Sequence, residues 1–280
     1  ENNKEQIDKL TETAVKNADA SEESAQLIAK VVANASDELA NKVVQEVTKN
    51  STEENQALSA KVMKSIVETN PEKIENLSDE NKSNIISQTI EAAKNQAEGN
   101  SSDSLDLSNT IAEIVTKSDD ETSAKVLETL SKATEDSESK LALNVVSNLT
   151  KQENFEEKLD MLSVTSSAVD QTINKLVEKA VENASTSDDL KLVSNIVENT
   201  KGSVADKIIN SANKSAESKK KITEIIVKVV ENNPEKAIEI IEKNKNTNTV
   251  LETVKTKIEN NEAVSTDDFS EVFDSDVSPN

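Results

Sequence analysis

The stretch Ser21–Lys73 reads SEESAQLIAKVVANASDELANKVVQEVTKNSTEENQALSAKVMKSIVETNPEK and contains three apolar patterns separated by short polar breaks. In the first pattern, Ala25, Ile28 and Val32 lie three and four residues apart, which is the spacing along one face of an α-helix. The second pattern repeats this spacing at Ala40, Val43, Val44 and Val47. The stretch therefore predicts short helices that stop and fold back on one another.

The polar breaks carry helix-end signals. Each pattern ends at an Asn, as at Asn34 and Asn50, and Asn is the non-glycine residue that best tolerates the left-handed conformation closing many helices. Each pattern resumes at Ser, Thr or Asp with Glu close behind, and Ser51-x-x-Glu54 has the spacing of a capping box. We therefore expect left-handed Asn residues at the helix ends and hydroxyl or carboxyl caps at the helix starts.

The breaks recur along the chain at intervals of 16 to 20 residues, and two helices with their turns span 33 to 37 residues. This length is close to the units of roughly 34 to 47 residues in helical solenoids. The motif Asn70-Pro71-Glu72-Lys73 returns as Asn233-Pro234-Glu235-Lys236, which indicates duplication of one unit. Because Pro suits the first helical position, each copy also predicts a turn into a helix.

We predict an all-α fold, an α-solenoid of stacked antiparallel helix hairpins with a repeat of about 33–37 residues. A single coiled coil would need unbroken heptads, whereas caps interrupt this chain throughout. The architecture resembles tetratricopeptide and HEAT solenoids in outline only, because the aromatic and Gly signature of the former is missing. The loop-like residues 99–104 predict a boundary between repeats at 1–98 and repeats at 105–262, followed by a tail at 263–280.

The composition narrows the possible classes of protein. Aromatic residues make up 1% of the chain, which has 2 Gly and 3 Pro, so sandwiches, barrels and doubly wound folds lack their usual turn and core residues. A net charge of −22 with 34% hydrophobic residues would suit disorder, but the regular apolar spacing favours helices. The chain has no Cys, His or Arg, so we expect no Cys–His or Ser–His catalysis, no Cys/His zinc site, no cofactor and no enzyme activity.

The acidic clusters admit two interpretations. Asp119, Asp120 and Glu121, and also Asp188 and Asp189, could form acid/base pairs. Each cluster falls where a helix is expected to start, and acids are stabilised there by the helix dipole. We favour the capping role.

Other binding signals are weak. The excess of acid, with no Arg and few aromatics, disfavours nucleic acid, and Lys219-Lys220-Lys221 is flanked by acids like a solvated face. Asp274-x-Asp276 hints at calcium, but the spacing, Gly and Glu of an EF-hand are absent. No apolar run reaches the roughly 20 residues of a membrane span. Triplets such as Asn34-Ala-Ser match the glycosylation pattern, as chance would produce in so Asn-rich a chain.

The tail gathers two of the three Phe residues. Phe269, Val272 and Phe273 have the spacing of one helix face, with Asp267 or Asp268 as the expected cap. Two interpretations stay open: the tail covers the exposed end of the last repeat, or it docks into a groove on the next copy. We take these three residues as the candidate interaction site.

The function expected from these observations is that of a non-catalytic structural protein, a subunit of a surface or extracellular assembly such as a filament. Its partner would be a second copy of the chain, bound head to tail, or another protein. The alternative is an intracellular adaptor for a protein or peptide, although the chain lacks the Trp, Tyr and Arg favoured at binding hot spots. Since the sequence starts at Glu1 rather than Met, we expect a processed chain or a fragment.

Overall fold

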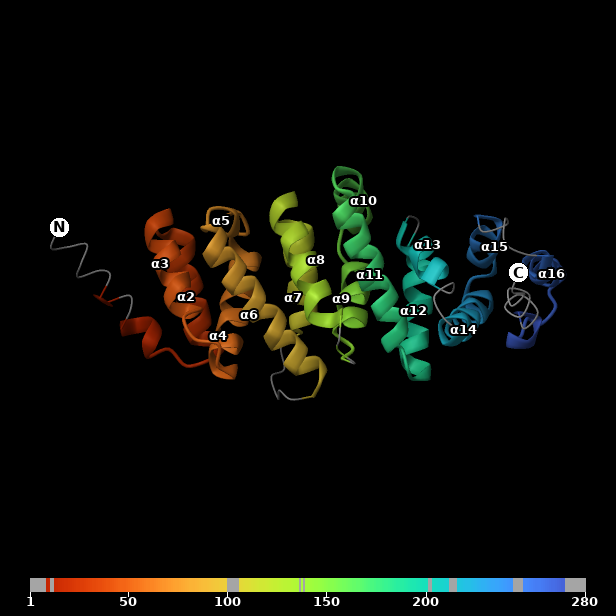
Figure 1. Cartoon of the computed structure of the whole chain (residues 1–280), viewed down its shortest axis with the longest axis horizontal. Coiled ribbons are helices and arrows are strands. Elements are labelled where there is room, and N and C mark those ends of the chain that lie inside the picture. The colour runs from red at the N-terminus through yellow and green to blue at the C-terminus, as the bar shows by residue number, and fades with distance from the viewer. Residues whose placement is uncertain are drawn as a thin grey trace, which may run out of the picture. The chain divides into compact units, whose positions relative to one another are not determined.

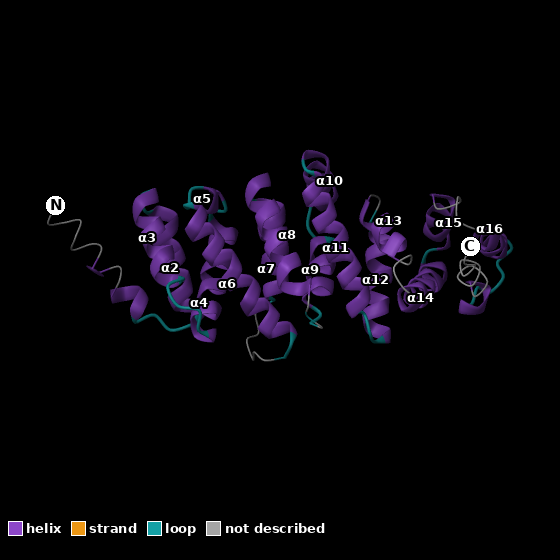
Figure 2. Ribbon diagram, in the orientation of Figure 1, coloured by secondary structure: helices purple, strands orange, loops and turns teal. Residues whose placement is uncertain are grey.

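The computed structural model describes residues 9–10, 13–99, 106–135, 137, 139–200, 203–211, 216–243 and 249–269. Throughout these ranges the chain forms helices joined by loops, without a β-strand (Figure 2). The helices contact one another, so the predicted all-α class is confirmed. Besides the helical residues 9–10 and 13–16, the elements labelled in Figure 1 and the short helix η3 are α2 (Glu22–Asn34), α3 (Asp37–Val47), α4 (Glu53–Thr69), α5 (Glu72–Glu75), α6 (Asp79–Ala97), α7 (Leu107–Lys117), α8 (Asp120–Glu135), α9 (Leu141–Leu149), α10 (Phe155–Thr165), α11 (Ser167–Asn183), α12 (Ser187–Asn199), α13 (Ser203–Asn210), α14 (Ala216–Asn232), α15 (Pro234–Lys243), α16 (Thr249–Glu259) and η3 (Thr266–Phe269).

The chain divides into two compact units, Glu1–Leu176 and Val177–Asn280, and the division falls within α11. In the first unit α2 packs against α4, α4 against α6, and α6 against α8, so helices separated by one element lie side by side (Figure 1). On the other side of residues 100–105, α7 packs against α4, α6, α8 and α9. The grouping of repeats around 99–104 stays a prediction.

The core of the first unit consists of aliphatic side chains at the helix positions that the periodicity indicates. Ala25, Ile28 and Val32 of α2 are all buried. So are Val43, Val44 and Val47 of α3. Since burying each such side chain contributes roughly 1.5–3 kcal/mol, these stripes are the main source of stability.

Lysines connect successive parts of the first unit. The Nζ atoms of Lys61, Lys73 and Lys158 donate to the main-chain oxygens of Ala20, Ala35 and Ser118, at 2.6, 3.1 and 2.8 Å. Lys125 does the same to the carbonyl of Asp79 at 3.2 Å. In each case donor and acceptor lie 38 to 46 residues apart, and the acceptor lies at or near the start of an earlier helix. An ammonium group therefore satisfies a main-chain carbonyl in an earlier part of the unit, through a charge-assisted hydrogen bond.

Side-chain amides form a second set of connections at similar separations. Asn81 Nδ2 donates to the carbonyl oxygen of Asn41 at 2.9 Å, 40 residues away. Asn148 and Gln152 reach Asp106 and Asn109, which lie 42 and 43 residues earlier. These separations lie above the 33 to 37 residues expected for one hairpin.

The predicted left-handed Asn residues are wrong at most helix ends. Among the described residues other than Gly, a positive φ occurs at Asn154 and Asn261, neither of which was predicted as a stop. Asn34 and Asn199 are instead the last helical residues, and their amides donate to the carbonyls of Lys30 and Asn195 at 2.8 and 2.7 Å. The side chain therefore gives a carbonyl of the last turn a second donor, and the helix ends without a change in backbone hand.

The helix starts follow the predicted chemistry, with one shift. α4 is capped by Thr52, whose Oγ1 accepts from the N–H of Asn55 at 3.3 Å, and not by the predicted pair Ser51 and Glu54. The register differs by one residue because either hydroxyl satisfies the sequence pattern. Pro234 is the first residue of α15, as its motif predicts, whereas Pro71 lies one residue before the short helix α5.

In the second unit, α12 packs against α14, α14 against α15, and α15 against α16. The two predicted long stripes lie in α11 and α14, where Val177 and Ile226 are buried. Lys221, a member of the predicted basic cluster, donates to the carbonyl of Glu182 and pairs with Glu217 at 3.1 Å. This lysine therefore repeats the connection seen in the first unit.

Candidate interaction surface

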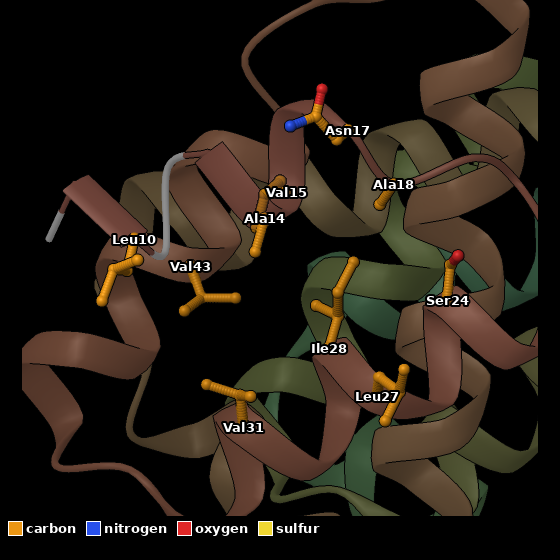
Figure 3. Close-up of a pocket in the computed structure, with 10 residues that line it drawn as sticks. All are labelled: Leu10, Ala14, Val15, Asn17, Ala18, Ser24, Leu27, Ile28, Val31 and Val43. Atoms are coloured by element: carbon orange, nitrogen blue, oxygen red, sulfur yellow. The ribbon is translucent and has the colours of Figure 1, made fainter. Parts of the chain in front are cut away.

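An open apolar groove lies between the N-terminal helical residues and helices α2 and α3 of the first unit. It has a volume of about 430 Å³. Figure 3 shows Leu10 and Ala14 on the N-terminal segment, Ile28 and Val31 on α2, and Val43 on α3 around one hollow. The remaining lining residues are Val15, Asn17, Ala18, Ser24 and Leu27.

The lining of the groove is apolar at eight of its ten residues, and Asn17 and Ser24 are the two polar ones. None of these side chains carries a charge. Leu10, Leu27 and Val31 are 70%, 64% and 45% exposed, although each is large and aliphatic. Exposed apolar side chains that line one hollow are a feature of interaction sites.

Helix α2 supplies the groove because it carries two apolar stripes. Ala25 and Val32 on one stripe are fully buried in the core. Leu27 and Val31, four residues apart, form the second stripe and lie against the groove. The first stripe was predicted from its apolar spacing. The second stripe was not predicted, although Leu27 and Val31 also have a helical spacing.

The residues Ile7, Leu10, Ala14 and Ala18 also have the spacing of one helix face, but Leu10, Ala14 and Ala18 do not form a buried face. Leu10 and Ala14 are exposed and line the groove together with Ala18, whereas Val15 is the residue of this segment that is buried. Ile7 lies outside the described residues. The four-residue spacing therefore follows the groove and not the core.

A second pair of exposed apolar side chains, Met161 and Val164, lies on α10. They are 48% and 89% exposed, and the opposite side of the helix buries Phe155, Leu159 and Leu162. Neither residue lines the groove. Val164 and Met161 therefore serve as matched comparisons for the groove residues.

The acidic cluster at the start of α8 has the capping role. Asp119 Oδ1 accepts from the N–H of Thr122 at 2.7 Å, and Asp120 pairs with Lys158 at 2.6 Å. Burial raises the pKa of Asp119, but hydrogen bonding from Thr122 and the charges of Lys82 and Lys158 outweigh it and leave the pKa below its ordinary value. Glu121 is exposed in the first turn.

The second acidic cluster also caps a helix. Asp189 Oδ2 accepts from the N–H groups of Ser185 and Thr186 at 3.1 and 2.9 Å, while Thr186 Oγ1 accepts from the N–H of Asp189. This is the reciprocal capping box at the start of α12, and Asp188 beside it is exposed. In the described part of the chain no three acidic side chains gather as metal ligands, and Asp274 and Asp276 lie outside it.

Part of the predicted tail site is described. Thr266–Phe269 form the short helix η3, which contacts α14 and α16. Asp268 was predicted as a possible cap, but it lies within η3. Its carboxylate accepts from the N–H of Ser265 at 2.8 Å and pairs with Lys257. The bond from Lys257, together with that from Ser265, lowers the pKa of Asp268 below its ordinary value.

Phe269 ends η3, and nothing further is described of its side chain. Val272 and Phe273 lie outside the described residues, so their predicted shared face stays a prediction. The start of the tail packs on its own unit. The covering and docking interpretations both concern the face of Phe269, Val272 and Phe273, and both stay predictions.

In the described ranges, no helix combines the length and the apolar character needed to cross a lipid bilayer. Comparison of the chain with protein-family models, with curated proteins and with solved structures finds no match. The groove and the anchored start of the tail are therefore the features from which a function can be argued.

Proposed function

We propose that this chain is a non-catalytic structural protein, a helical-repeat subunit that associates with copies of itself into a surface or extracellular assembly such as a filament. The observation that carries the proposal is the open apolar groove, with Leu10, Leu27 and Val31 exposed around it. Stacked helical repeats need a cover over an exposed apolar end. A second copy of the chain can supply that cover.

The geometry of a groove favours a head-to-tail contact. A hollow is not self-complementary, so its occupant must come from a different surface of the partner. Such a heterologous contact leaves each subunit with one free groove and one free donor surface. Repetition of the contact then builds an open chain of subunits.

The charge of the chain predicts how this assembly depends on salt. Each copy carries a net charge of −22, so copies repel one another, and the groove has no charged side chain to offset the repulsion. Salt shortens the Debye length, which is about 8 Å at physiological ionic strength, and strengthens apolar burial when its anions are kosmotropic. We therefore expect assembly to increase with ionic strength.

Electron microscopy and sedimentation velocity of the purified chain, at low and high salt over a series of concentrations, test the proposal. Filaments or oligomers that grow with concentration and salt are the expected result. Monodisperse particles under every condition would overturn it. That outcome would favour the alternative, a helical-repeat adaptor whose groove receives another protein.

A further inference from the structure

We infer that the groove on α2 and α3 receives the C-terminal segment 270–280 of a second copy, with Val272 and Phe273 as its anchors. This inference rests on the proposed function and names the two surfaces that meet. The groove requires apolar, uncharged side chains at the point of contact, because its lining contains eight apolar residues and no charge. Its volume of about 430 Å³ lies in the range of about 300–1,000 Å³ typical of ligand pockets and accommodates one or two large side chains.

The chain itself contains a segment that carries such side chains, because Val272 and Phe273 lie together between the acidic Glu271 and Asp274. Of its three Phe residues, Phe155 is buried in the first unit. Phe273 lies in the segment after η3, with Val272 beside it and Val277 four residues later. Among the segments outside the described residues, 1–8 and 100–105 each contain one large aliphatic residue and no aromatic one. The C-terminal segment is therefore the best match in apolar content.

The segment also follows directly after η3, which is packed on other helices of its own unit. η3 contacts α14 and α16, and Asp268 joins Lys257 and the N–H of Ser265 immediately before it. From Phe269 onward, residues 270–280 reach at most about 40 Å when extended. A short segment tethered to a packed helix loses less conformational freedom on docking than a free peptide does.

The first experiment measures binding of the segment directly. The probe is a fluorescently labelled peptide of residues 264–280, added to the full chain carrying Phe273→Ser so that the chain's own segment does not compete. Saturable binding is expected. The same peptide with Phe273→Ser should bind at least about tenfold more weakly, because a buried Phe side chain is lost.

Groove variants locate the binding site. Leu27→Gln with Val31→Gln removes two exposed apolar side chains, and Gln keeps good helix propensity, so α2 should fold normally. Peptide binding should fall at least about tenfold. Met161→Gln with Val164→Gln makes the same change on α10 and should leave binding unchanged. Equal binding by both double variants would overturn the groove assignment.

Assembly assays separate this inference from the proposed function. If the unmodified chain assembles and the groove variant still assembles, the inference fails and the proposed function stands. If the chain does not assemble but the peptide still binds the groove, the contact forms within one chain, and both the second-copy assignment and the proposed function fail. If the chain neither assembles nor binds the peptide, both fail as well.

Mixing two disabled chains gives the most specific result. A chain with Leu27→Gln and Val31→Gln retains its segment, and a chain with Phe273→Ser retains its groove. Each should be monomeric alone. An equimolar mixture should form one-to-one dimers and nothing larger, because a single intact contact exists per pair. Polymers in the mixture, or no dimer, would contradict the pairing.

Discussion

The hydroxyl of Ser59 on α4 donates to Oε1 of Gln88 on α6 at 2.6 Å, and both side chains are buried. The amide nitrogen of Gln88 donates in turn to the carbonyls of Thr48 and Asn50, at 2.8 and 3.0 Å. One side chain thus joins α4, α6 and the loop after α3. No such polar contact was predicted from the sequence.

Replacing Gln88 by Leu should lower the free energy of unfolding by about 2–4 kcal/mol, since it removes the acceptor of the buried Ser59 hydroxyl and the donor to the carbonyl oxygens of Thr48 and Asn50. Gln45→Leu on α3 is the control, because Gln45 is exposed and should change stability by less than about 0.5 kcal/mol. Urea unfolding followed by circular dichroism measures both. Equal stabilities would mean that the network contributes nothing.

Lys158 and Lys132 form ion pairs of the same length, 2.6 Å, in different surroundings. The Lys158 side chain is 14% exposed and also bonds the carbonyl of Ser118, whereas the Lys132 side chain is 72% exposed. Lys158→Met should therefore cost about 1–3 kcal/mol, and Lys132→Met less than about 0.5 kcal/mol. Thermal unfolding distinguishes the two, and a larger loss for Lys132 would contradict the connecting role of Lys158.

Ile226 and Val177 test the core of the second unit, since they are 5% and 2% exposed. Ile226→Ala should cost about 2–5 kcal/mol, and Val177→Ala about 1–3 kcal/mol, through lost burial and the cavity left behind. Val164→Ala, at a side chain 89% exposed, should leave stability unchanged. Hydrogen exchange should show the loss mainly in helices adjacent to the substitution. Unchanged exchange in both core variants would show that the stripes are not core.

Asn154 precedes α10 with a left-handed backbone, whereas Asn34 ends α2 with a helical backbone, and glycine substitutions distinguish these two conformations. Asn154 has a φ of 59°, so Asn154→Gly should keep or raise stability, and Asn154→Ala should cost about 1 kcal/mol. Asn34 is helical and bonds the carbonyl of Lys30, so Asn34→Gly should cost about 1 kcal/mol or more. Calorimetric melting temperatures of these variants give the comparison, and the reverse order would refute it.

Acid should release the start of the tail. The folded-state pKa of Asp268 lies below its ordinary value of 3.8, so its stabilising effect is complete above the unfolded value and is lost as the pH falls through the folded value. Nuclear magnetic resonance should show the amide signal of Ser265 shifting in that window, because its N–H donates to Asp268. Asp268→Asn should abolish the pH dependence. A transition that persists in this variant would assign it to another group.

Much of the helical structure follows from local sequence features, namely apolar spacing and helix-capping residues. Apolar spacing identified the buried stripe Ala25, Ile28 and Val32, and the acids at Asp119 and Asp189 cap helices as expected. These features depend on neighbours within one turn of the chain, so periodicity and capping rules suffice to find them. The left-handed Asn ends were wrong because Asn34 and Asn199 stay helical, and their amides donate to carbonyls four residues earlier in the same helix.

The groove and the long-range polar contacts were beyond sequence reasoning because they depend on which helix lies opposite. Leu27 and Val31 have the same apolar character and helical spacing as the buried residues beside them, and α4 covers one stripe of α2 while the other stripe stays open. From its residue type alone, Gln88 would be expected on the surface. Packing of α6 against α4 buries it, and its amide donates to the carbonyls of Thr48 and Asn50. Local sequence patterns are sufficient to place the helices and to identify the apolar face of each. Tertiary packing alone decided which apolar faces are covered, since burial depends on contacts between residues far apart in the chain.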